Sequence, residues 1–344
     1  MRILHVANFN THKYGADLHA TDRKISAGFI QNGHFVYDFS YRDVCRNESI
    51  FKTTKFGTAK VNKKLIQTCE NLRPHLLLLG HSELIEPQTL EQIKTSFPEM
   101  KIGLWYVDAL FHKEKTLHVL KRLPSIDVVF ATTGGNYLRE YTQSNTIAAF
   151  IPNIVDPAVE TGKAFDNSKY DHDFIFCGRD SNDQERQSFM EKLQQETTKH
   201  LRCTFKGCLG NSPITGYKYI DFLSRSKMAL NISRRNDVTL YSSDRLIQLV
   251  GNGLLTFCPK IPDMSRLFSD DELVYYDNAE DLIHKIIYYH KNGEEARIIA
   301  QKGWQRAHRC YTGERITRFM LELLFEDHFS DNYEWKDVIF HPSP

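Results

Sequence analysis

The sequence predicts an α/β protein made of two Rossmann-like, doubly wound domains that face each other across a cleft. Three observations carry this prediction. Short apolar runs rich in β-branched and aromatic residues alternate with stretches of helical period along the chain. The length of 344 residues suits two domains of ordinary size. A polar, turn-rich stretch around Thr161 and Asp166 separates two such sets of elements.

The first domain is expected at residues 1–155. The helix after its first strand carries Leu18, Ile25 and Phe29 on one face and ends at Asn32-Gly33, where glycine can adopt the left-handed cap conformation. The expected strands are Ile3–Asn8, Phe35–Phe39, His75–Leu79, Ile102–Asp108, Asp127–Ala131 and Ala148–Ile151.

The second domain is expected at residues 170–311. Its predicted strands are Phe174–Cys177, Arg202–Phe205, Met228–Ile232, Leu254–Cys258 and Leu273–Tyr276, with helices near 184–199, 243–250, 279–291 and 294–309. Open α/β sheets bind ligands outside the carboxyl ends of their strands. Two facing sheets would therefore put two such edges on opposite walls of a cleft.

Residues 312–344 extend beyond what the second domain needs. One apolar stripe marks a final helix, formed by Ile316, Phe319, Met320, Leu323 and Leu324. We expect this helix and the acidic, aromatic tail after it to cross back and pack on the first domain. A plain amphipathic helix on the second domain is the alternative.

Composition excludes several classes of protein. The formal net charge of +1 lacks the basic excess of a nucleic-acid-binding protein, so we expect no nucleic-acid partner. No apolar run approaches the ~20 residues that a bilayer span needs, and the N-terminus lacks a secretory apolar region. We therefore expect a cytoplasmic protein. The oligomeric state stays open.

Cysteine and histidine patterns argue against a metal. The seven cysteines include no C-x-x-C pair, and histidine pairs such as His12 and His19, or His112 and His118, lack the H-E-x-x-H pattern. We expect no metal site, no disulfide framework and no bound cofactor.

The second half carries a run of motifs in a fixed order, from Ser226-Lys-Met-Ala-Leu-Asn through Tyr241-Ser-Ser-Asp-Arg-Leu-Ile-Gln to His308-Arg-Cys-Tyr-Thr. About ninety residues, up to Arg315, resemble the C-terminal half of CgeB-like glycosyltransferases, within the group that also contains the family-4 enzymes. The first half is similar more loosely, at Tyr14-Gly-Ala and at Ile102-Gly-Leu-Trp-Tyr-Val-Asp. The resemblance implies the GT-B architecture and a nucleotide-sugar co-substrate.

A nucleotide-sugar leaves a diphosphate whose negative charge grows as the glycosidic bond breaks, and GT-B enzymes stabilise it with protein cations. Arg179, preceded by Gly178, resembles the Gly-Arg that contacts phosphate in family-4 enzymes, and Lys206 follows the next strand. Arg245 matches the family's arginine, and Asn231 lies near the end of the strand before it. Solvated loop residues, or an internal salt bridge of Arg245 to Asp244 or Asp237, are the alternatives.

Ser243 and Asp244 are expected to cap the helix that Arg245 opens, leaving N–H groups free for an anion. The chain departs from the family at Leu240 and Gln248, where family-4 enzymes often carry two glutamates, the second of which binds the ribose. A glutamine accepts more weakly than a carboxylate, so donor binding is reshaped or the donor is unusual. Gly253 fits either a close approach to the ligand or a tight turn.

In the first domain, candidate catalytic residues follow strands or lie in the first loop. Asp108 at a strand end is the first candidate for a general base or a sugar contact, followed by His81 and by Asp17 beside Gly15. Each has a cap or turn residue as its alternative reading. Whether transfer inverts or retains the sugar's configuration stays open.

We therefore expect a metal-independent glycosyltransferase that moves a sugar to a saccharide, lipid-linked glycan or protein acceptor. Its place in bacterial surface-glycan synthesis is implied by the resemblance alone. A GT-B-fold nucleotide-sugar epimerase and a non-catalytic nucleotide-sugar-binding protein stay open as alternatives.

Aromatic and basic side chains also gather in the first half, and they could meet an acidic membrane at its inner face. They are Phe51, Lys52, Lys55, Phe56, Lys60, Lys63 and Lys64. A solvated loop and helix face is the alternative.

Overall fold

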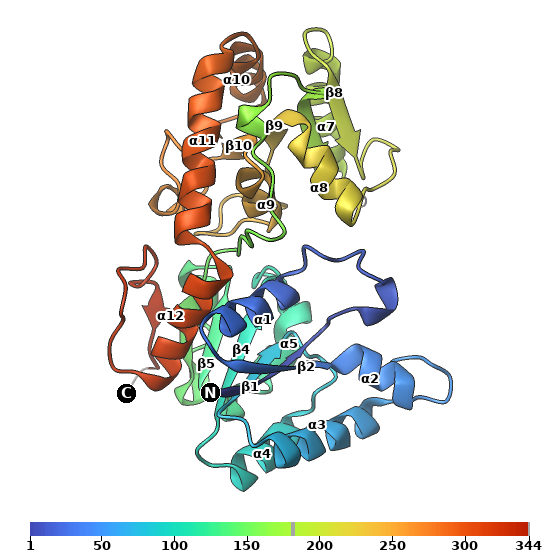
Figure 1. The fold of residues 1–344 in the computed structure, drawn as a ribbon, viewed down its shortest axis with the longest axis vertical. Helices are drawn as coiled ribbons and strands as arrows, with labels where there is room; N and C mark the ends of the chain where they lie inside the picture. The colour runs from blue at the N-terminus through green and yellow to red at the C-terminus, as the bar shows by residue number, and fades with distance from the viewer. Residues whose placement is uncertain (180–182, 343–344) are drawn as a thin grey trace. The chain divides into compact units, whose positions relative to one another are not determined.

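The computed structural model describes residues 1–179 and 183–342. The chain divides into two compact units (Figure 1). Unit 1 comprises Met1–Pro152 and Gly313–Pro344, and unit 2 comprises Asn153–Thr312. Each unit has one mainly parallel sheet with helices between its strands, so the predicted doubly wound α/β class is confirmed.

Unit 1 is built on a seven-stranded sheet in the order β12-β6-β5-β4-β3-β1-β2. All neighbours are parallel except β12, which pairs antiparallel with β6. The sequence of β3 is Leu-Leu-Leu-Leu-Gly and every residue is buried, as a central parallel strand requires. The strands are β1 (Arg2–Ala7), β2 (Phe35–Ser40), β3 (Leu76–Gly80), β4 (Lys101–Tyr106), β5 (Val128–Ala131), β6 (Ile147–Phe150) and β12 (Ile339–Phe340).

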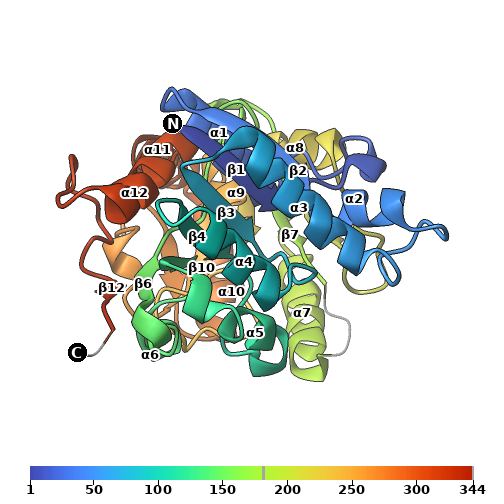
Figure 2. The same cartoon turned by 90° about the horizontal axis from the view of Figure 1, so that it is seen from below.

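The helices of unit 1 cover this sheet, and α3 and α4 lie side by side (Figure 2). In the described part of the unit they are α1 (Thr21–Gln31), α2 (Tyr41–Glu48), α3 (Thr58–Leu72), α4 (Pro87–Ser96), α5 (Lys113–Leu120), α6 (Gly135–Arg139) and α12 (Gly313–Phe325).

Helix α12 packs against α1 through a close glycine contact. A Cβ atom on Gly28 would lie 2.3 Å from the carbonyl oxygen of Gly313, so neither helix could approach this closely with a larger residue. Asn32 at the end of α1 donates to the carbonyl of Glu314 at 2.8 Å and to Thr317 Oγ1 at 2.9 Å. The final helix is therefore bonded to the first helix of the chain.

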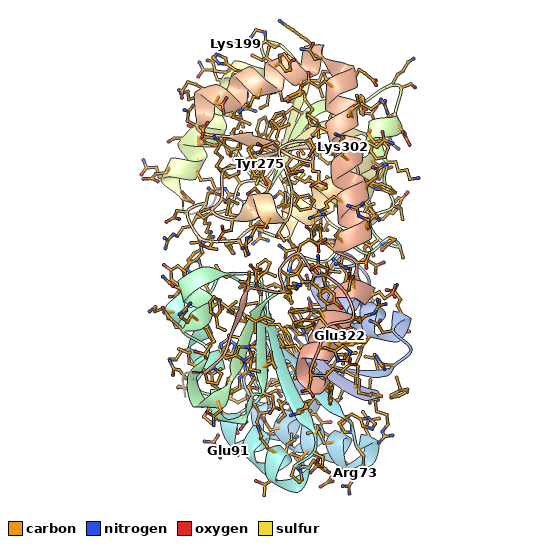
Figure 3. The ribbon with its side chains drawn as sticks, turned by 90° about the vertical axis from the view of Figure 1, so that its left-hand side faces the viewer. Arg73, Glu91, Lys199, Tyr275, Lys302 and Glu322 are labelled. Atoms are coloured by element: carbon orange, nitrogen blue, oxygen red, sulfur yellow. The ribbon has the colours of Figure 1, made fainter. Side chains whose placement is uncertain are left out.

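The tail after α12 folds back onto it. The carboxylate of Glu322, on α12 (Figure 3), is 4% exposed and accepts a hydrogen bond from Tyr333 at 2.8 Å. Arg315 pairs with Asp331 and Glu334, both at 2.6 Å. These bonds, of which the one to Glu322 is buried, hold the tail that ends in strand β12.

Unit 2 has a five-stranded sheet in the order β11-β10-β9-β7-β8, with every neighbouring pair parallel. Its strands are β7 (His172–Cys177), β8 (Cys203–Lys206), β9 (Ser226–Leu230), β10 (Leu255–Pro259) and β11 (Val274–Tyr276). Its described helices are α7 (Gln184–Thr197), α8 (Tyr217–Ser224), α9 (Arg245–Gly251), α10 (Ala279–Lys291) and α11 (Gly293–Cys310). Phe174, Phe176 and Phe257 lie in its core.

The predicted strands are all present, with their ends shifted by a residue or two. Helices α2 and α8 and strand β12 were not predicted. Helix α2 is only eight residues long, so the few apolar residues on its buried face, such as Tyr41 and Cys45, are too short a pattern to predict a helix from the sequence. No helix in the described part of the chain has the length and apolarity to cross a bilayer.

Candidate functional site

The strand order of unit 2 reverses between β7 and β9, and Arg245 lies at this point. Its Nε donates to the carbonyl of Cys177 at 2.5 Å, and its Nη1 donates to the carbonyl of Ile232 at 3.0 Å. The guanidinium thus joins the end of β7 to the residues after β9. Ligands of doubly wound sheets bind at this reversal. Arg245 therefore lies at this reversal, and its contact with a phosphate stays a prediction.

Arg186, in the first turn of α7, meets Arg245 at the same carbonyl. Its Nη2 donates to Ile232 at 3.2 Å, while its buried Nε has no hydrogen-bond partner among the described residues. Burial, and then the positive charge of Arg245, lower the pKa of Arg186 to about 10. Within residues 1–179 and 183–342, no ion pair joins either arginine to a carboxylate. The charge of Asp183 offsets that of Arg186 in part, while the positive charge of Arg245 opposes it.

Gly178, Arg179 and Lys206 extend this positive edge along β7 and β8. The N–H of Gly178 donates to the carbonyl of Lys206 at 3.0 Å. A Cβ atom on Gly178 would lie 2.7 Å from Nη2 of Arg245, so only glycine leaves room for the guanidinium. Arg179 is exposed and Lys206 is partly buried. The three predicted cations and Arg186 thus lie at one end of the sheet.

The predicted side-chain cap of α9 is wrong. Asp244 occupies the N-cap position with helical angles, φ −60° and ψ −13°, and its side chain makes no capping hydrogen bond. Its carboxylate instead accepts from the amide Nε2 of Gln248, one turn later, at 2.9 Å. Gln248 is 4% exposed, so this residue orients the Asp244 carboxylate instead of presenting its own amide to solvent.

Two further predicted residues have hydrogen-bonding capacity left over. The Oδ1 atom of Asn231 and the Oγ atom of Ser243 are buried and have no partner among the described residues. Asn231 directly precedes Ile232, whose carbonyl the two arginines share. A buried polar atom without a partner costs about 1–3 kcal/mol, which is a reason to expect function at this strand end.

Gly253 has a structural role of its own. Its φ is +77°, and a Cβ atom there would lie 2.7 Å from the ring of Phe165 and 2.9 Å from the backbone nitrogen of Ala164. The tight turn between α9 and β10 therefore requires glycine whether or not a ligand approaches.

In unit 1, His81 and Asp108 follow the neighbouring strands β3 and β4. Their Nδ1 and Oδ2 atoms are 3.8 Å apart, with His81 25% and Asp108 66% exposed at the side chain. The imidazole also packs on the ring of Tyr106, with centroids 4.3 Å apart. Burial lowers the pKa of His81, and the charge of Asp108 partly opposes this. The histidine is therefore neutral at pH 7 and can accept a proton.

A buried arginine holds the backbone that presents His81. His81 and Ser82 have φ values of 53° and 50°, a left-handed conformation that is unfavourable for residues other than glycine. Arg122, which is 1% exposed, donates to the carbonyls of Ser82 at 2.8 Å, His81 at 2.6 Å and His118 at 2.9 Å. Sequence reasoning missed Arg122, because an arginine next to Lys121 resembles a solvated residue.

Asp17 and Gly15 lie in an exposed turn after β1. Asp17 accepts from Asn10 at 2.8 Å and pairs with Lys13 at 2.6 Å, whereas His81 and Asp108 lie 3.8 Å from each other. Gly15 has φ +88° and open space beside it. The structure therefore does not bring Asp17 together with the other two catalytic candidates.

Asp22 was also missed. It lies in the first turn of α1, and its Oδ1 accepts from the N–H of Asn8, just after β1, at 2.9 Å. Burial raises its pKa to about 6. A carboxyl group that titrates near neutrality at the carboxyl end of a central strand is a further acid or base candidate.

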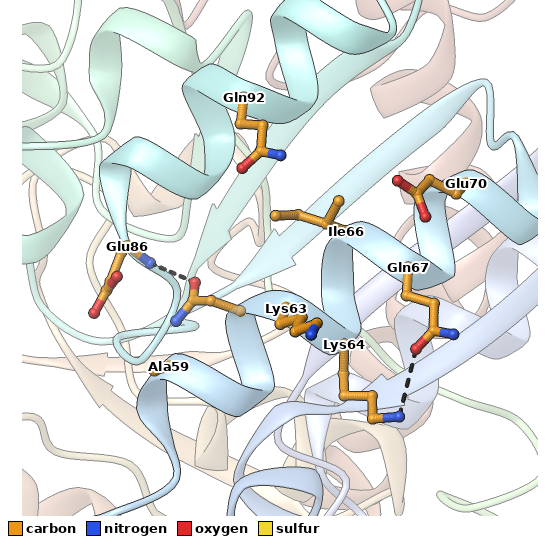
Figure 4. A pocket seen from close by; sticks show the side chains of 9 residues that line it. Ala59, Lys63, Lys64, Ile66, Gln67, Glu70, Glu86 and Gln92 are labelled. Atoms are coloured by element: carbon orange, nitrogen blue, oxygen red, sulfur yellow. Dashed lines mark hydrogen bonds between the residues drawn. The ribbon is translucent and has the colours of Figure 1, made fainter.

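Unit 1 also has two hollows. A groove of about 790 Å³ runs between α3 and α4 and includes Lys63, Gln67, Glu70 and Gln92 in its lining (Figure 4). A second hollow, of about 360 Å³, is lined by residues that include Glu83 and His118. None of the predicted site residues lines either one.

Metal-ligating side chains do not gather in the described part of the chain. Among residues 1–179 and 183–342, no group of three or more His, Cys, Asp and Glu is placed to hold a metal ion. No disulfide joins any of the seven cysteines, all of which lie in the described residues.

Comparison with known proteins agrees with the fold. Residues 181–322 match the family model for glycosyl transferase-like domains. No curated protein sequence matches the chain. Among solved structures, sucrose-phosphate synthase (tll1590) of Thermosynechococcus elongatus aligns with a TM-score of 0.60 and 12% identity, covering 94% of this chain and 98% of that one.

Two further structures are similar. Anabaena HepE (Alr3699), in complex with UDP and glucose, aligns with a TM-score of 0.56 and 13% identity, covering 94% of this chain and 99% of that one. A Listeria monocytogenes protein assigned as a UDP-N-acetylglucosamine 2-epimerase aligns with a TM-score of 0.52 and 12% identity, covering 96% and 98%. The predicted GT-B fold class is thereby confirmed, and the family match supports a glycosyltransferase. A narrower CgeB-like or family-4 membership is not shown.

Proposed function

We propose that this protein transfers a sugar from a nucleotide-sugar donor to an acceptor hydroxyl, without a metal. The donor's diphosphate would lie at the carboxyl ends of β7, β8 and β9, against Arg179, Arg186, Lys206 and Arg245. The acceptor is a saccharide, a lipid-linked glycan or a protein, in the synthesis of bacterial surface glycans. The complex of HepE with UDP and glucose supports a nucleotide-sugar donor for this fold.

The observation that carries the proposal is the meeting of Arg186 and Arg245 on the carbonyl of Ile232. Two guanidinium groups repel each other, and burial of Arg186 makes its charge more expensive to keep. A diphosphate at this edge would neutralise both groups and offer acceptors to their remaining N–H groups. The same charges would stabilise the leaving nucleotide in the transition state.

In unit 1 we assign proton transfer to His81, with Asp108 beside it. The neutral imidazole takes the proton of the acceptor hydroxyl as its oxygen bonds to the anomeric carbon. The bond from that carbon to the diphosphate oxygen breaks, and its electron pair stays on the diphosphate. Asp108 would stabilise the imidazolium that forms.

The proposal is tested by incubating the protein with a panel of nucleotide-sugars and measuring free nucleotide, with and without acceptor extracts. Transfer predicts nucleotide release that depends on the acceptor and is unchanged by a chelator. An isomerised nucleotide-sugar formed without nucleotide release would identify the epimerase, for which the Listeria structure is the specific observation. Thermal stabilisation by a nucleotide-sugar with neither product would identify a binding protein.

A further inference from the structure

We propose that unit 1 docks on an anionic lipid bilayer through a surface formed by the α2–α3 loop and the start of α3. This inference is independent of the proposed reaction and concerns where the protein works. We call it the lysine–aromatic surface, and it consists of Ile50, Phe51, Lys52, Lys55, Phe56, Lys60, Lys63 and Lys64.

The loop exposes three large apolar side chains within seven residues. Ile50 is 87% exposed, Phe51 70% and Phe56 69%. The two phenylalanine rings contact each other, with centroids 5.6 Å apart, so they form one apolar patch. Single exposed apolar residues are common, but such a cluster at the tip of a loop marks a surface that a partner covers.

The segment that contains this patch carries positive side chains and no negative ones. Residues 49–69 contain five lysines and no aspartate or glutamate, in a chain whose formal net charge is only +1. All five lysines are exposed. Lys60 donates to the carbonyl of Glu48 at 2.9 Å and Lys64 to the amide of Gln67 at 3.4 Å, both neutral acceptors. The surface therefore keeps its positive charge for an anionic partner.

The loop is tied down at its base, so its tip cannot easily collapse. A Cβ atom on Gly57 would lie 2.3 Å from the carbonyl of Cys45, and the thiol of Cys45 donates to the carbonyl of Thr54 at 3.4 Å. The backbone N–H of Ser49 also donates to Cys45, at 3.1 Å. Figures 1 and 2 both show the loop projecting beyond the end of α2. The exposed side chains are thus presented outward by a fixed base.

A lipid surface fits this combination better than another macromolecule. Aromatic and aliphatic side chains can enter the boundary between headgroups and acyl chains, while lysines just behind them meet anionic headgroups. A nucleic acid would leave the apolar side chains at the loop tip exposed to water. The positive region ends at the groove of Figure 4, where Glu70 and Glu86 join Lys63 and Lys64. Contact is therefore expected at the loop and the first turns of α3.

Co-sedimentation of the full chain with vesicles tests the proposal. One set is pure phosphatidylcholine, and the other contains one part phosphatidylglycerol to two parts phosphatidylcholine. We expect binding to the second set, little binding to the first, and release by salt. Lys52→Glu/Lys55→Glu should weaken binding by about 20-fold or more, and Phe51→Ser/Phe56→Ser by about tenfold.

Tyr217→Ser/Lys218→Glu is the matched control, because both residues are exposed on α8 and Tyr217 is 74% exposed. It should bind vesicles as the wild type does. Circular dichroism and thermal melting should be unchanged for all variants, since every substituted residue is exposed.

Three results would overturn the proposal. Equal binding to both vesicle sets would show that the lysines do not recognise anionic headgroups. Absence of binding to either set would show that the surface does not bind a lipid bilayer. Light scattering that shows a lipid-free oligomer broken by Phe51→Ser/Phe56→Ser would make the surface an interface between copies of this chain. None of these results depends on sugar transfer, so failure here and failure of the proposed function are distinguishable.

Discussion

In both units the first strand of the sheet lies between the second and the third, at β1 in unit 1 and at β7 in unit 2. The side chains at the carboxyl ends of the two sheets differ in kind. Unit 2 has Arg186 and Arg245 sharing one carbonyl, whereas unit 1 has a neutral histidine beside an exposed carboxylate. The topology of the sheet determines where a ligand binds, and the side chains at that place determine which sign of ligand charge is bound there.

The arginines show the contrast most clearly. Arg122 in unit 1 directs Nε, Nη1 and Nη2 to backbone carbonyls and is 1% exposed. Arg186 in unit 2 keeps an unpartnered Nε among the described residues. The first arginine therefore stabilises its own chain, and the second has donors left for a ligand.

The largest expected effect comes from removing the cations of unit 2. In Arg186→Gln/Arg245→Gln we expect turnover of the active nucleotide-sugar to fall about 10³-fold or more, because the leaving diphosphate loses its stabilising charges. Steady-state kinetics measures this, with circular dichroism to verify folding. Arg297→Gln is the control. Arg297 pairs with Glu294 at 2.7 Å on the surface of α11, so this variant should behave as the wild type does. A double variant with normal turnover would place the diphosphate elsewhere.

The second effect concerns stability in unit 1. Arg122→Met removes three hydrogen bonds from a guanidinium to backbone carbonyls, so the free energy of unfolding of this unit should fall by about 3 kcal/mol. Hydrogen exchange of the β3 and β4 amides measures this unit separately. Arg139→Met, at an exposed position on α6, should change exchange little. Unchanged protection in Arg122→Met would mean that His81 and Ser82 hold their backbone conformation without it.

The three arginines Arg122, Arg186 and Arg245 also show how much of the site the sequence can predict. The strands could be predicted because apolar runs and helical periods alternate regularly, and Arg245 could be placed because it lies in a run that resembles a known family. Arg186 lies in a polar helical segment, Gln-Glu-Arg-Gln-Ser, and nothing local marks it as turned toward the sheet. Arg122 is similarly unmarked, since inward burial of its guanidinium depends on carbonyls about forty residues away.

Asp244 and Gln248 illustrate a second limit. The sequence correctly marks Gln248 as unusual, but the two side chains bond to each other, and a pattern of residue types cannot show such a pairing. Gly253 illustrates a third, because its neighbours Ala164 and Phe165 come from a segment nearly ninety residues earlier.

Lowering the pH should reduce the stability of unit 1 more than that of unit 2, and this effect should be smaller than that of Arg122→Met. His5 in unit 1 is fully buried, accepts from Trp105 at 2.8 Å, and has its pKa lowered from 6.5 to about 3 by burial. As pH falls below 6.5, the unfolded chain binds a proton that folded unit 1 excludes, so stability falls with pH, by about 2 kcal/mol near pH 5. In the described part of unit 2 no histidine is buried.

Hydrogen exchange at neutral pH and near pH 5 should therefore show a larger loss of protection in unit 1 than in unit 2. His5→Gln removes the titrating group while keeping an acceptor, and it should reduce the pH dependence of unit 1. Equal losses in the two units would contradict the assignment to His5.

The smallest effect tests the proton acceptor itself. The charge of Asp108 raises the pKa of His81 against the lowering caused by burial. In Asp108→Asn that pKa falls further, so the acid limb of kcat/KM should move to lower pH by about half a unit, and His81→Asn should remove the limb. Asp17→Asn is the control. Asp17 pairs with Lys13 at 2.6 Å, so this variant should leave the acid limb of kcat/KM in place. If Asp108→Asn did not move it, another group would titrate, and Asp22, with a pKa raised to about 6, would be next to replace by asparagine. Loss of the limb in Asp22→Asn would then assign the titrating group to Asp22.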